Sequence, residues 1–502
     1  MIDGATDASG KENKTVHCRF VKDGVPTNQL VGHKEVAHAH AQGILDTVNG
    51  AFQVSGIHHW KEKVVGMGAD GASVNLGKKG GVVALLRQEV PHLIDFHCLP
   101  HRLELALLEM QRSCKLLETI YEVLQLIWKT YHYSPKSMRE LQAVGTKLGV
   151  NVLKPTQVSR TRWLPHISWA LKVMIEPGKE GSGQYTAVLS HMDHLSAASK
   201  NTDVKGRAKY VAEKMRSIQF SAFCHFLADM FEIIAKLSLK MQRNDLILPV
   251  AVSLLHETVV NIEALKIRPV PNGHLARFMN MLQHSGVKDE LRFQGITLRG
   301  LLDGKPKRGD VRTGSFQSRV NEAIGLCLTG LEERFGSLMN SASNSESTTK
   351  YGTADVINNL LVFNVDAWPK RTKELVDFGK EKIERLLDCF RDKDYASLWE
   401  TLLIKTPYKD DFENVLHLVD ILLVQLISAA QCERAISAQN RIKSSVRVNL
   451  AVSMLEDLIC ISAEGPPAAE FDPTPSINKW LTRNRDAGER LRRPHFQRSS
   501  LK

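Results

Sequence analysis

A hairpin signal followed by alternating helix and strand patterns is the feature that most limits how this chain can fold. Polar and apolar residues alternate over 14–21, Asp23-Gly24 supplies a turn, and 25–31 continues as a second strand. The segments that follow are predicted, in order, as a helix at 38–54, a strand at 63–66, a helix at 80–90, a strand at 93–96 and a helix at 102–131. With a short strand at the start of the chain, this order predicts an α/β fold.

The order of strand, hairpin, helix, strand, helix, strand and helix is that of a ribonuclease-H-like core, a mixed sheet covered by helices. Only a stub of the first strand is expected, because two residues precede Asp3. The middle of the chain is helical in pattern, which predicts a large all-helical insertion. The expected domains are the N-terminal part of the core at 1–115, the insertion at 116–405, a C-terminal region completing the core at 406–462, and a basic tail at 463–502.

Three acidic residues far apart in the sequence are candidates for one metal site: Asp3, Asp70 and Glu433. Singly, each has an ordinary explanation, since Asp before Gly is common in turns and Glu433 has arginines nearby with which it can pair on a helix. In a ribonuclease-H-like core, however, carboxylates lie on the first strand, at the end of the fourth and on a late helix. Such acids would hold Mg²⁺ or Mn²⁺ for phosphoryl-transfer chemistry.

Composition narrows the class of protein. A chain of 502 residues with 43% hydrophobic content is long enough for two or three packed domains, and a net charge of +11 favours nucleic acid as a partner. No run of about 18 apolar residues predicts a membrane span. The most apolar stretch, 415–430, is interrupted by polar residues and is predicted as a buried helix. An intracellular protein without a membrane anchor is expected, with its eight scattered cysteines mostly buried.

Two further groups of residues carry open alternatives. Cys98 and His101 have the spacing of two zinc ligands, but a structural zinc site needs four, so a helix start with a buried cysteine is the competing interpretation. Arg160, Arg162 and Trp163 place an aromatic face beside cations, which suits stacking on an unpaired base of DNA. A tryptophan packed inside the insertion explains Trp163 equally well.

Several short motifs, taken together, resemble the hAT superfamily of DNA transposases, particularly its vertebrate host-gene relatives of the zinc finger protein 862-like kind. The resemblance covers nearly the whole chain. The matching pieces are Asp3-Gly-Ala-Thr-Asp7, Asp70-Gly-Ala-Ser73, Cys98-Leu-Pro-His101 with Arg102-Leu-Glu-Leu-Ala106, Arg162-Trp163, and Cys432-Glu433-Arg434-Ala-Ile-Ser437.

The resemblance implies a catalytic core split by a helical insertion, Asp3, Asp70 and Glu433 as catalytic Mg²⁺ ligands, and a C-terminal region that forms a homodimer or higher oligomer. The short first strand and the lack of a zinc-finger signature depart from the family pattern. We therefore expect a nuclear, also cytoplasmic, transposase-derived protein that binds DNA, dimerises and regulates, with weak or no catalysis. The open alternatives are an active Mg²⁺-dependent DNA transposase and a protein-interaction scaffold.

Overall fold

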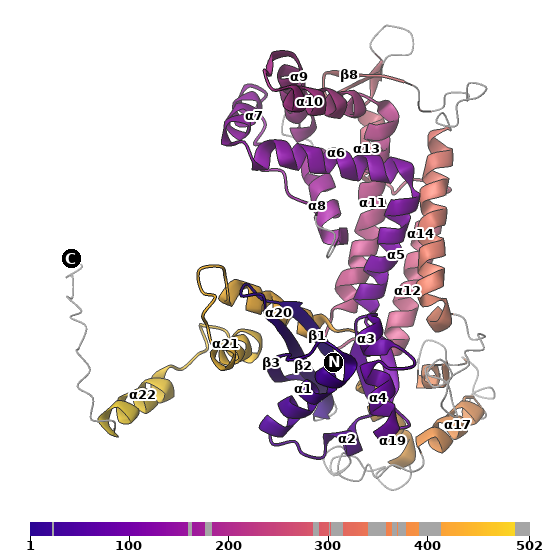
Figure 1. Cartoon of the computed structure of the whole chain (residues 1–502). Coiled ribbons are helices and arrows are strands. Elements are labelled where there is room, and N and C mark those ends of the chain that lie inside the picture. Colours follow the sequence, from indigo (N-terminus) through magenta and orange to yellow (C-terminus); the bar gives the residue numbers. More distant parts are fainter. Residues whose placement is uncertain are drawn as a thin grey trace.

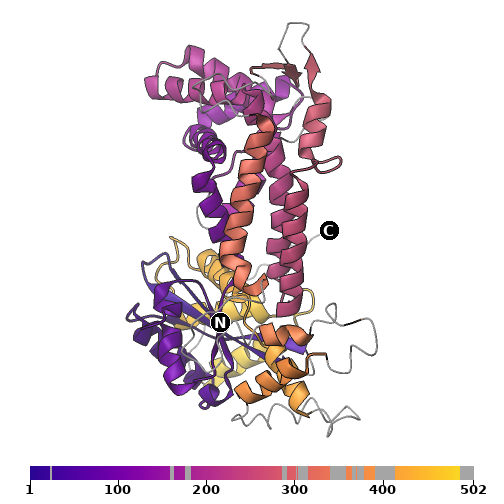
Figure 2. The same cartoon turned by 90° about the vertical axis from the view of Figure 1, so that its right-hand side faces the viewer.

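The structure is a computed structural model of a mixed α/β protein that is mostly helical (Figure 1). It describes residues 1–22, 25–158, 163–175, 183–284, 291–300, 302, 315–339, 358–363, 369, 378–390 and 413–486. Two lobes lie at the ends of a set of long helices, as both views show (Figures 1 and 2). The N-terminal and C-terminal parts of the sequence that carry the candidate acids both lie in the lower lobe.

The strands of the lower lobe form two small sheets. β1 (Ile2–Thr6), β2 (Glu12–Lys22) and β3 (Val25–Glu35) make an antiparallel sheet in that order, and β4 (Gly66–Ala69) pairs in parallel with β5 (Ile94–His97). β1 contacts β4, but no hydrogen-bonded ladder joins them among the described residues. The expected order of strands and longer helices is confirmed, with the short helices α2 (Trp60–Lys63) and α3 (Ser73–Leu76) in addition, whereas among the described residues the strands form two separate small sheets instead of one mixed sheet.

The helices of the lower lobe form because their apolar residues recur at helical spacing and face the strands. Ile44, Leu45 and Val48 of α1 are buried against β2 and β3. The other helices here are α2 (Trp60–Lys63), α3 (Ser73–Leu76), α4 (Val82–Glu89), α19 (Glu413–Leu423), α20 (Ala430–Ile442) and α21 (Val452–Glu464). The strand expected at 63–66 begins later, at Gly66, because Lys63 is the last residue of α2.

The helical region begins at Leu99. The long helices between the lobes are α5 (Leu99–Ser113), α11 (Ile218–Met241), α12 (Leu248–Ala264) and α14 (Phe316–Met339). The upper lobe contains α6 (Lys115–His132), α7 (Pro135–Lys147), α8 (Trp163–Ile175), α9 (Gln184–Ala198), α10 (Thr202–Met215) and α13 (His274–Met281) (Figure 1). α17 (Lys380–Phe390) contacts α19 of the lower lobe, and the short 3-10 turn Leu361–Phe363 contacts α12.

Three expectations about this region are corrected. The helix expected at 102–131 is two helices, because Cys114 has extended backbone angles and lets α6 turn away from α5. The insertion is not all-helical, since β6 (Gln283–His284), β7 (Leu291–Phe293) and β8 (Ile296–Leu298) form a small antiparallel sheet. The helix expected at 415–430 ends at Leu423, and the chain is not helical again until Ala430.

One hydrophobic core runs from the lower lobe through the long helices. It includes Phe96 of β5, Leu103 of α5, Phe231 of α11 and Ile427. α11 is the one described helix that is long and apolar enough to cross a membrane, but most of it is buried in this core, as in the central helix of a water-soluble domain. At the far end of the described chain, α22 (Thr474–Asp486) extends away from the lower lobe (Figure 1).

Candidate acidic site

The three candidate acids lie on neighbouring elements of the lower lobe. Asp3 is on β1, Asp70 directly follows β4, and Glu433 is in the first turn of α20. α20 packs against β1 and β2, while β1 also contacts β4. Segments separated by more than 350 residues in the sequence therefore bring acidic side chains to one side of β1.

The pKa of Asp3 reports this arrangement. Burial is the largest cause that raises it, and the negative charges of Asp70 and Glu433 raise it further, to about 6. The backbone N–H of Gly4 donates to Asp3 Oδ1 at 2.8 Å and opposes the increase, as does the nearby Lys14. Asp3 therefore senses both other carboxylates, which is the electrostatic signature of converging acids.

Cys98 connects the elements that carry Asp70 and Glu433. Its backbone N–H donates to Ala69 O at the end of β4 (2.9 Å), and its Sγ accepts from the backbone N–H of Ala429, which precedes α20 (3.3 Å). The next residue, Leu99, donates its N–H to Ile427 O at 3.0 Å. This cysteine thus fixes the start of α20 relative to the end of β4.

A buried ion pair, which the sequence patterns did not single out, holds the other end of α20. Lys443 Nζ lies 2.7 Å from Asp7 Oδ2, and the two side chains are 2% and 0% exposed. Burial alone would raise the pKa of Asp7, but hydrogen bonds from Lys443, Ser9 and the backbone of Lys11 lower it well below its usual range. Asp7 is the last residue of the Asp3-Gly-Ala-Thr-Asp7 motif. Nothing in the sequence indicated that it pairs with a lysine 436 residues away.

Whether these acids can hold a metal ion depends on the chemistry and the placement of their donor atoms. Carboxylates are suitable ligands for Mg²⁺. Among the residues that the structure describes, however, no three His, Cys, Asp or Glu side chains are grouped closely enough to hold a metal ion. Asp70 Oδ1 instead accepts hydrogen bonds from Asn75 Nδ2 and the Ala72 backbone. In this conformation the acids are neighbours without forming a coordination sphere, and the Mg²⁺ assignment stays a prediction.

The Cys98 and His101 pair does not form a zinc site with other described residues. The thiol of Cys98 is buried, and burial raises its pKa to about 12, so it is protonated at neutral pH. The ring of His101 lies 5.5 Å from that of His97. These contacts favour the structural interpretation of this motif, a helix start with a buried cysteine.

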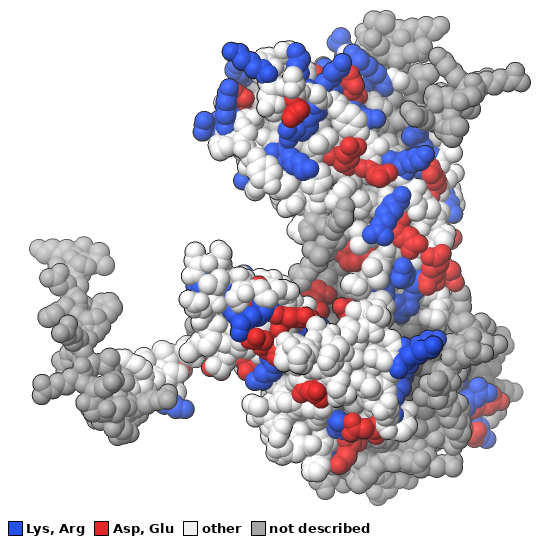
Figure 3. Space-filling view, in the orientation of Figure 1, with Lys and Arg blue, Asp and Glu red and all other residues white. Residues whose placement is uncertain are grey.

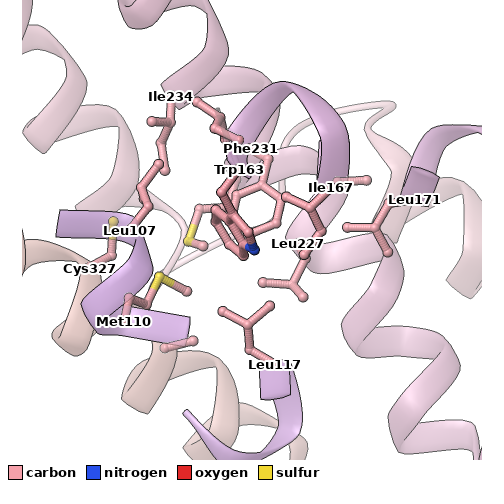
Figure 4. Close-up of a cluster of buried hydrophobic side chains, with 14 of the residues drawn as sticks. Leu107, Met110, Leu117, Trp163, Ile167, Leu171, Leu227, Phe231, Ile234 and Cys327 are labelled. Carbon is pink, nitrogen blue, oxygen red and sulfur yellow. The ribbon is translucent and has the colours of Figure 1, made fainter. Parts of the chain in front are cut away.

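Trp163 is not available for stacking on a base. Its indole has no exposed surface and meets the ring of Phe231 edge-on, with 5.4 Å between ring centroids. Figure 4 shows it among Leu107, Met110 and Leu227, inside the core of the helical region. Its expected role in DNA contact is corrected to core packing, and Arg160 and Arg162 lie outside the described residues.

A basic surface, absent from the sequence predictions, lies on the upper lobe. Lys and Arg side chains gather on the upper lobe, where α7 and α10 lie, with acidic side chains among them (Figure 3). On α7 and α10 the exposed basic residues are Lys136, Arg139, Lys147, Lys205 and Lys209. We call these five residues the upper basic surface. These residues belong to two helices that are separate in the sequence. Both helices pack on α9, which brings the residues to the same lobe.

A comparison with known protein-family models finds none that matches this chain.

Proposed function

We propose that this protein is a transposase-derived, nucleic-acid-binding protein that dimerises and acts in regulation, with weak or no catalytic activity. Its lower lobe would be a ribonuclease-H-like core completed by α20. Support for this origin comes from the order of strands and helices and from the influence of Asp70 and Glu433 on the pKa of Asp3.

The observation that carries the binding function is the upper basic surface. An array of exposed lysines and arginines attracts the phosphates of nucleic acid and releases condensed counterions on binding. The formal charge of +11 over the whole sequence favours a polyanionic partner. DNA would lie across α7 and α10 in the upper lobe, away from the acidic site in the lower lobe (Figures 1 and 3).

A salt titration with a fluorescent duplex of mixed sequence tests this proposal. Replacement of Lys147, Lys205 and Lys209 by Gln should weaken binding and lower the slope of log K against log salt by about 1 for each lost phosphate contact. The loss should be similar for different duplex sequences, because phosphate contacts carry no sequence information.

A matched control replaces three exposed lysines outside the upper lobe, Lys11, Lys63 and Lys240, by Gln. This variant has the same net charge as the first one but keeps the upper basic surface. It should retain the parent slope. Equal losses in both variants would reduce the effect to net charge, and a parent that does not bind duplex DNA would contradict the proposal.

The second candidate function is an active Mg²⁺-dependent DNA transposase, which the convergence of Asp3, Asp70 and Glu433 favours. Calorimetric titration of Mg²⁺ or Mn²⁺ into the parent, Asp70→Asn and Glu433→Gln distinguishes the two. Binding that both substitutions abolish, but that Asp46→Asn on α1 retains, would establish a shared metal site. No difference among these chains would leave the acids without a metal-binding role.

The third candidate, a protein-interaction scaffold, is favoured by exposed apolar side chains on α22, including Ile477 and Trp480. Such a protein would bind its partner with little dependence on salt, whereas binding to DNA phosphates weakens steeply as salt rises. The duplex titration therefore separates this candidate from the first.

A further inference from the structure

A groove of about 340 Å³ lies between α11 and α12, two of the long helices between the lobes (Figure 2). It shares no lining residue with the acidic site or the upper basic surface. α11 lines it with Ile233, Lys236, Leu237 and Lys240, α12 with Leu254, Glu257, Thr258, Asn261, Ala264 and Leu265, and the end of α12 is followed by the lining segment 268–271. Because these residues recur at intervals of three and four on both helices, the groove runs along the helices, over roughly 16 Å of α12.

The floor of the groove is apolar. Leu237 and Leu265 are buried, while Ile233 and Leu254 are partly buried. Thr258 is the one buried polar residue among the described lining residues, and its hydroxyl donates to Leu254 O at 2.7 Å. The floor therefore offers an occupant apolar contact and requires no hydrogen bond from it.

The rim of the groove carries an excess of positive charge. Its charged residues are three exposed cations and one exposed carboxylate: Lys236, Lys240, Arg268 and Glu257. Glu257 lies 3.8 Å from Lys240, whereas Lys236 and Arg268 form no ion pair with a residue that the structure describes. The acid nearest to Lys236 in the sequence of α11 is Glu232, which is paired with Lys172 at 2.9 Å. Two cations beside the apolar floor are thus open to carboxylates of an occupant.

We propose that the groove between α11 and α12 binds an acidic amphipathic helix of a partner protein. Apolar side chains at intervals of three and four residues on one side of that helix would lie on the floor. Glu and Asp side chains beside this apolar stripe would face Lys236 and Arg268. About three turns of helix match the length of the groove along α12. This assigns a protein partner to a surface that the proposed DNA contact does not use.

Charge and shape favour this partner over three other occupants. DNA phosphates would match the cations but would leave the apolar floor uncovered. The exposed apolar helix α22 of a second copy would be repelled by the rim, because the sequence of α22 holds three basic residues and one acidic residue. A small anionic amphiphile carries one charged group, whereas the cations lie both on α11 and after the end of α12.

Fluorescence anisotropy of a designed peptide, added to the full chain, tests the proposal. The peptide has about 15 residues, enough to form a helix on binding, with Leu at intervals of three and four and with Glu and Ala at the other positions. Lys236→Gln combined with Arg268→Gln should weaken its binding about tenfold, because two ion pairs are lost. Lys205→Gln combined with Lys209→Gln on α10 is the matched control, since it removes the same charge and should retain the parent affinity.

A second pair of variants tests the groove without changing the charge of its rim. Ala264→Phe places a ring in the groove and should also weaken peptide binding about tenfold. His256→Phe adds the same ring at an exposed position of α12 that does not line the groove, and it should leave the affinity unchanged. Equal effects of the two substitutions would overturn the assignment to the groove.

The proposal would also be overturned if the parent did not bind the acidic peptide, or if it bound a peptide with Lys in place of Glu equally well. A loss of affinity for duplex DNA, with unchanged peptide binding, in the Lys236 and Arg268 variant would assign the groove to DNA. Displacement of the acidic peptide by a peptide of residues 474–486 would assign it to a second copy, and equal displacement by dodecanoate to a small amphiphile. Because peptide binding is measured without DNA, this proposal can fail separately from the proposed function.

Discussion

Asp3 is the residue whose environment is most unfavourable to its charge. Its pKa of about 6 lies above its ordinary value of 3.8, mainly because of burial and then because of Asp70 and Glu433. The folded protein therefore binds a proton more tightly than the unfolded chain, and this group favours folding only at low pH. Its contribution to folding is lost as pH rises from about 4 to about 6. At neutral pH the charged carboxylate lowers the free energy of unfolding by up to about 3 kcal/mol relative to low pH, at 1.36 kcal/mol per pKa unit.

We predict that Asp3→Asn raises the free energy of unfolding at pH 7.5 and has little effect at pH 4. Asparagine retains a side-chain oxygen that can accept from Gly4 but carries no charge. Urea denaturation at both pH values measures the difference. Asp46→Asn on the exposed side of α1 is the control and should show no comparable dependence on pH. A loss of stability at pH 7.5 would show that Asp3 is stabilised by a favourable partner.

The ion pair between Asp7 and Lys443 should behave in the opposite way. Lys443→Met leaves a buried carboxylate without its cation, which costs about 3–5 kcal/mol. Asp7→Asn combined with Lys443→Met should cost less than the sum of the single substitutions, because the two groups are in direct contact. Since the pKa of Asp7 is lowered in the folded state, its stabilising contribution is present above pH 4 and is lost as pH falls below that value. Thermal unfolding of the three variants at pH 7 and pH 3 checks both statements, and additive costs would contradict them.

At the scale of secondary-structure elements, the order of the first eight segments was predictable, because hydrophobic periodicity and turn residues are local signals. The breaks were not. Cys114 interrupts a continuous apolar stripe, and the segment at 424–429 leaves the helical conformation to pack along β4 and α5. Contacts with distant parts of the chain decide where both helices end, and such contacts cannot be read from a single sequence. The same holds for Trp163, which follows Arg160 and Arg162 in the sequence but has apolar neighbours in space.

Gly68 shows how closely these elements approach each other. A Cβ atom there would lie 2.5 Å from the backbone oxygen of Leu426, which cannot move without displacing the segment before α20. We predict that Gly68→Ala destabilises the protein by about 1–3 kcal/mol. Gly50→Ala in α1 is the matched control: its Cβ would meet open space, and it should stabilise the helix by up to about 1 kcal/mol. Denaturant unfolding compares the two, and equal signs would contradict the packing described here.

Over the whole molecule, the lobes have distinct electrostatic and apolar surfaces. The upper lobe carries the upper basic surface, the lower lobe carries the acidic site, and α22, which extends away from the lower lobe, carries exposed apolar residues (Figure 1). Ile477, Trp480 and Leu481 are each more than half exposed and recur at a spacing of three and four residues, which places them on one side of the helix. Exposed apolar stripes of this kind mark sites of association.

The C-terminal region at 406–462 was the part expected to dimerise; we now predict that α22, which lies in the segment expected to be a basic tail, also forms part of the dimer interface. Replacement of Ile477 and Trp480 by Ser should weaken the dimer at least about tenfold, a loss of 1.4 kcal/mol or more, because large apolar anchors dominate interface energies. Sedimentation velocity over a range of concentrations measures the change. Trp169→Ser is the matched control, since Trp169 is 51% exposed but belongs to α8 in the upper lobe. A parent chain that stays monomeric at all concentrations, or an equal effect of Trp169→Ser, would contradict the prediction.

If dimerisation through α22 holds, one dimer would carry two upper basic surfaces. The affinity for DNA should then fall when the dimer dissociates, even though no basic residue has changed.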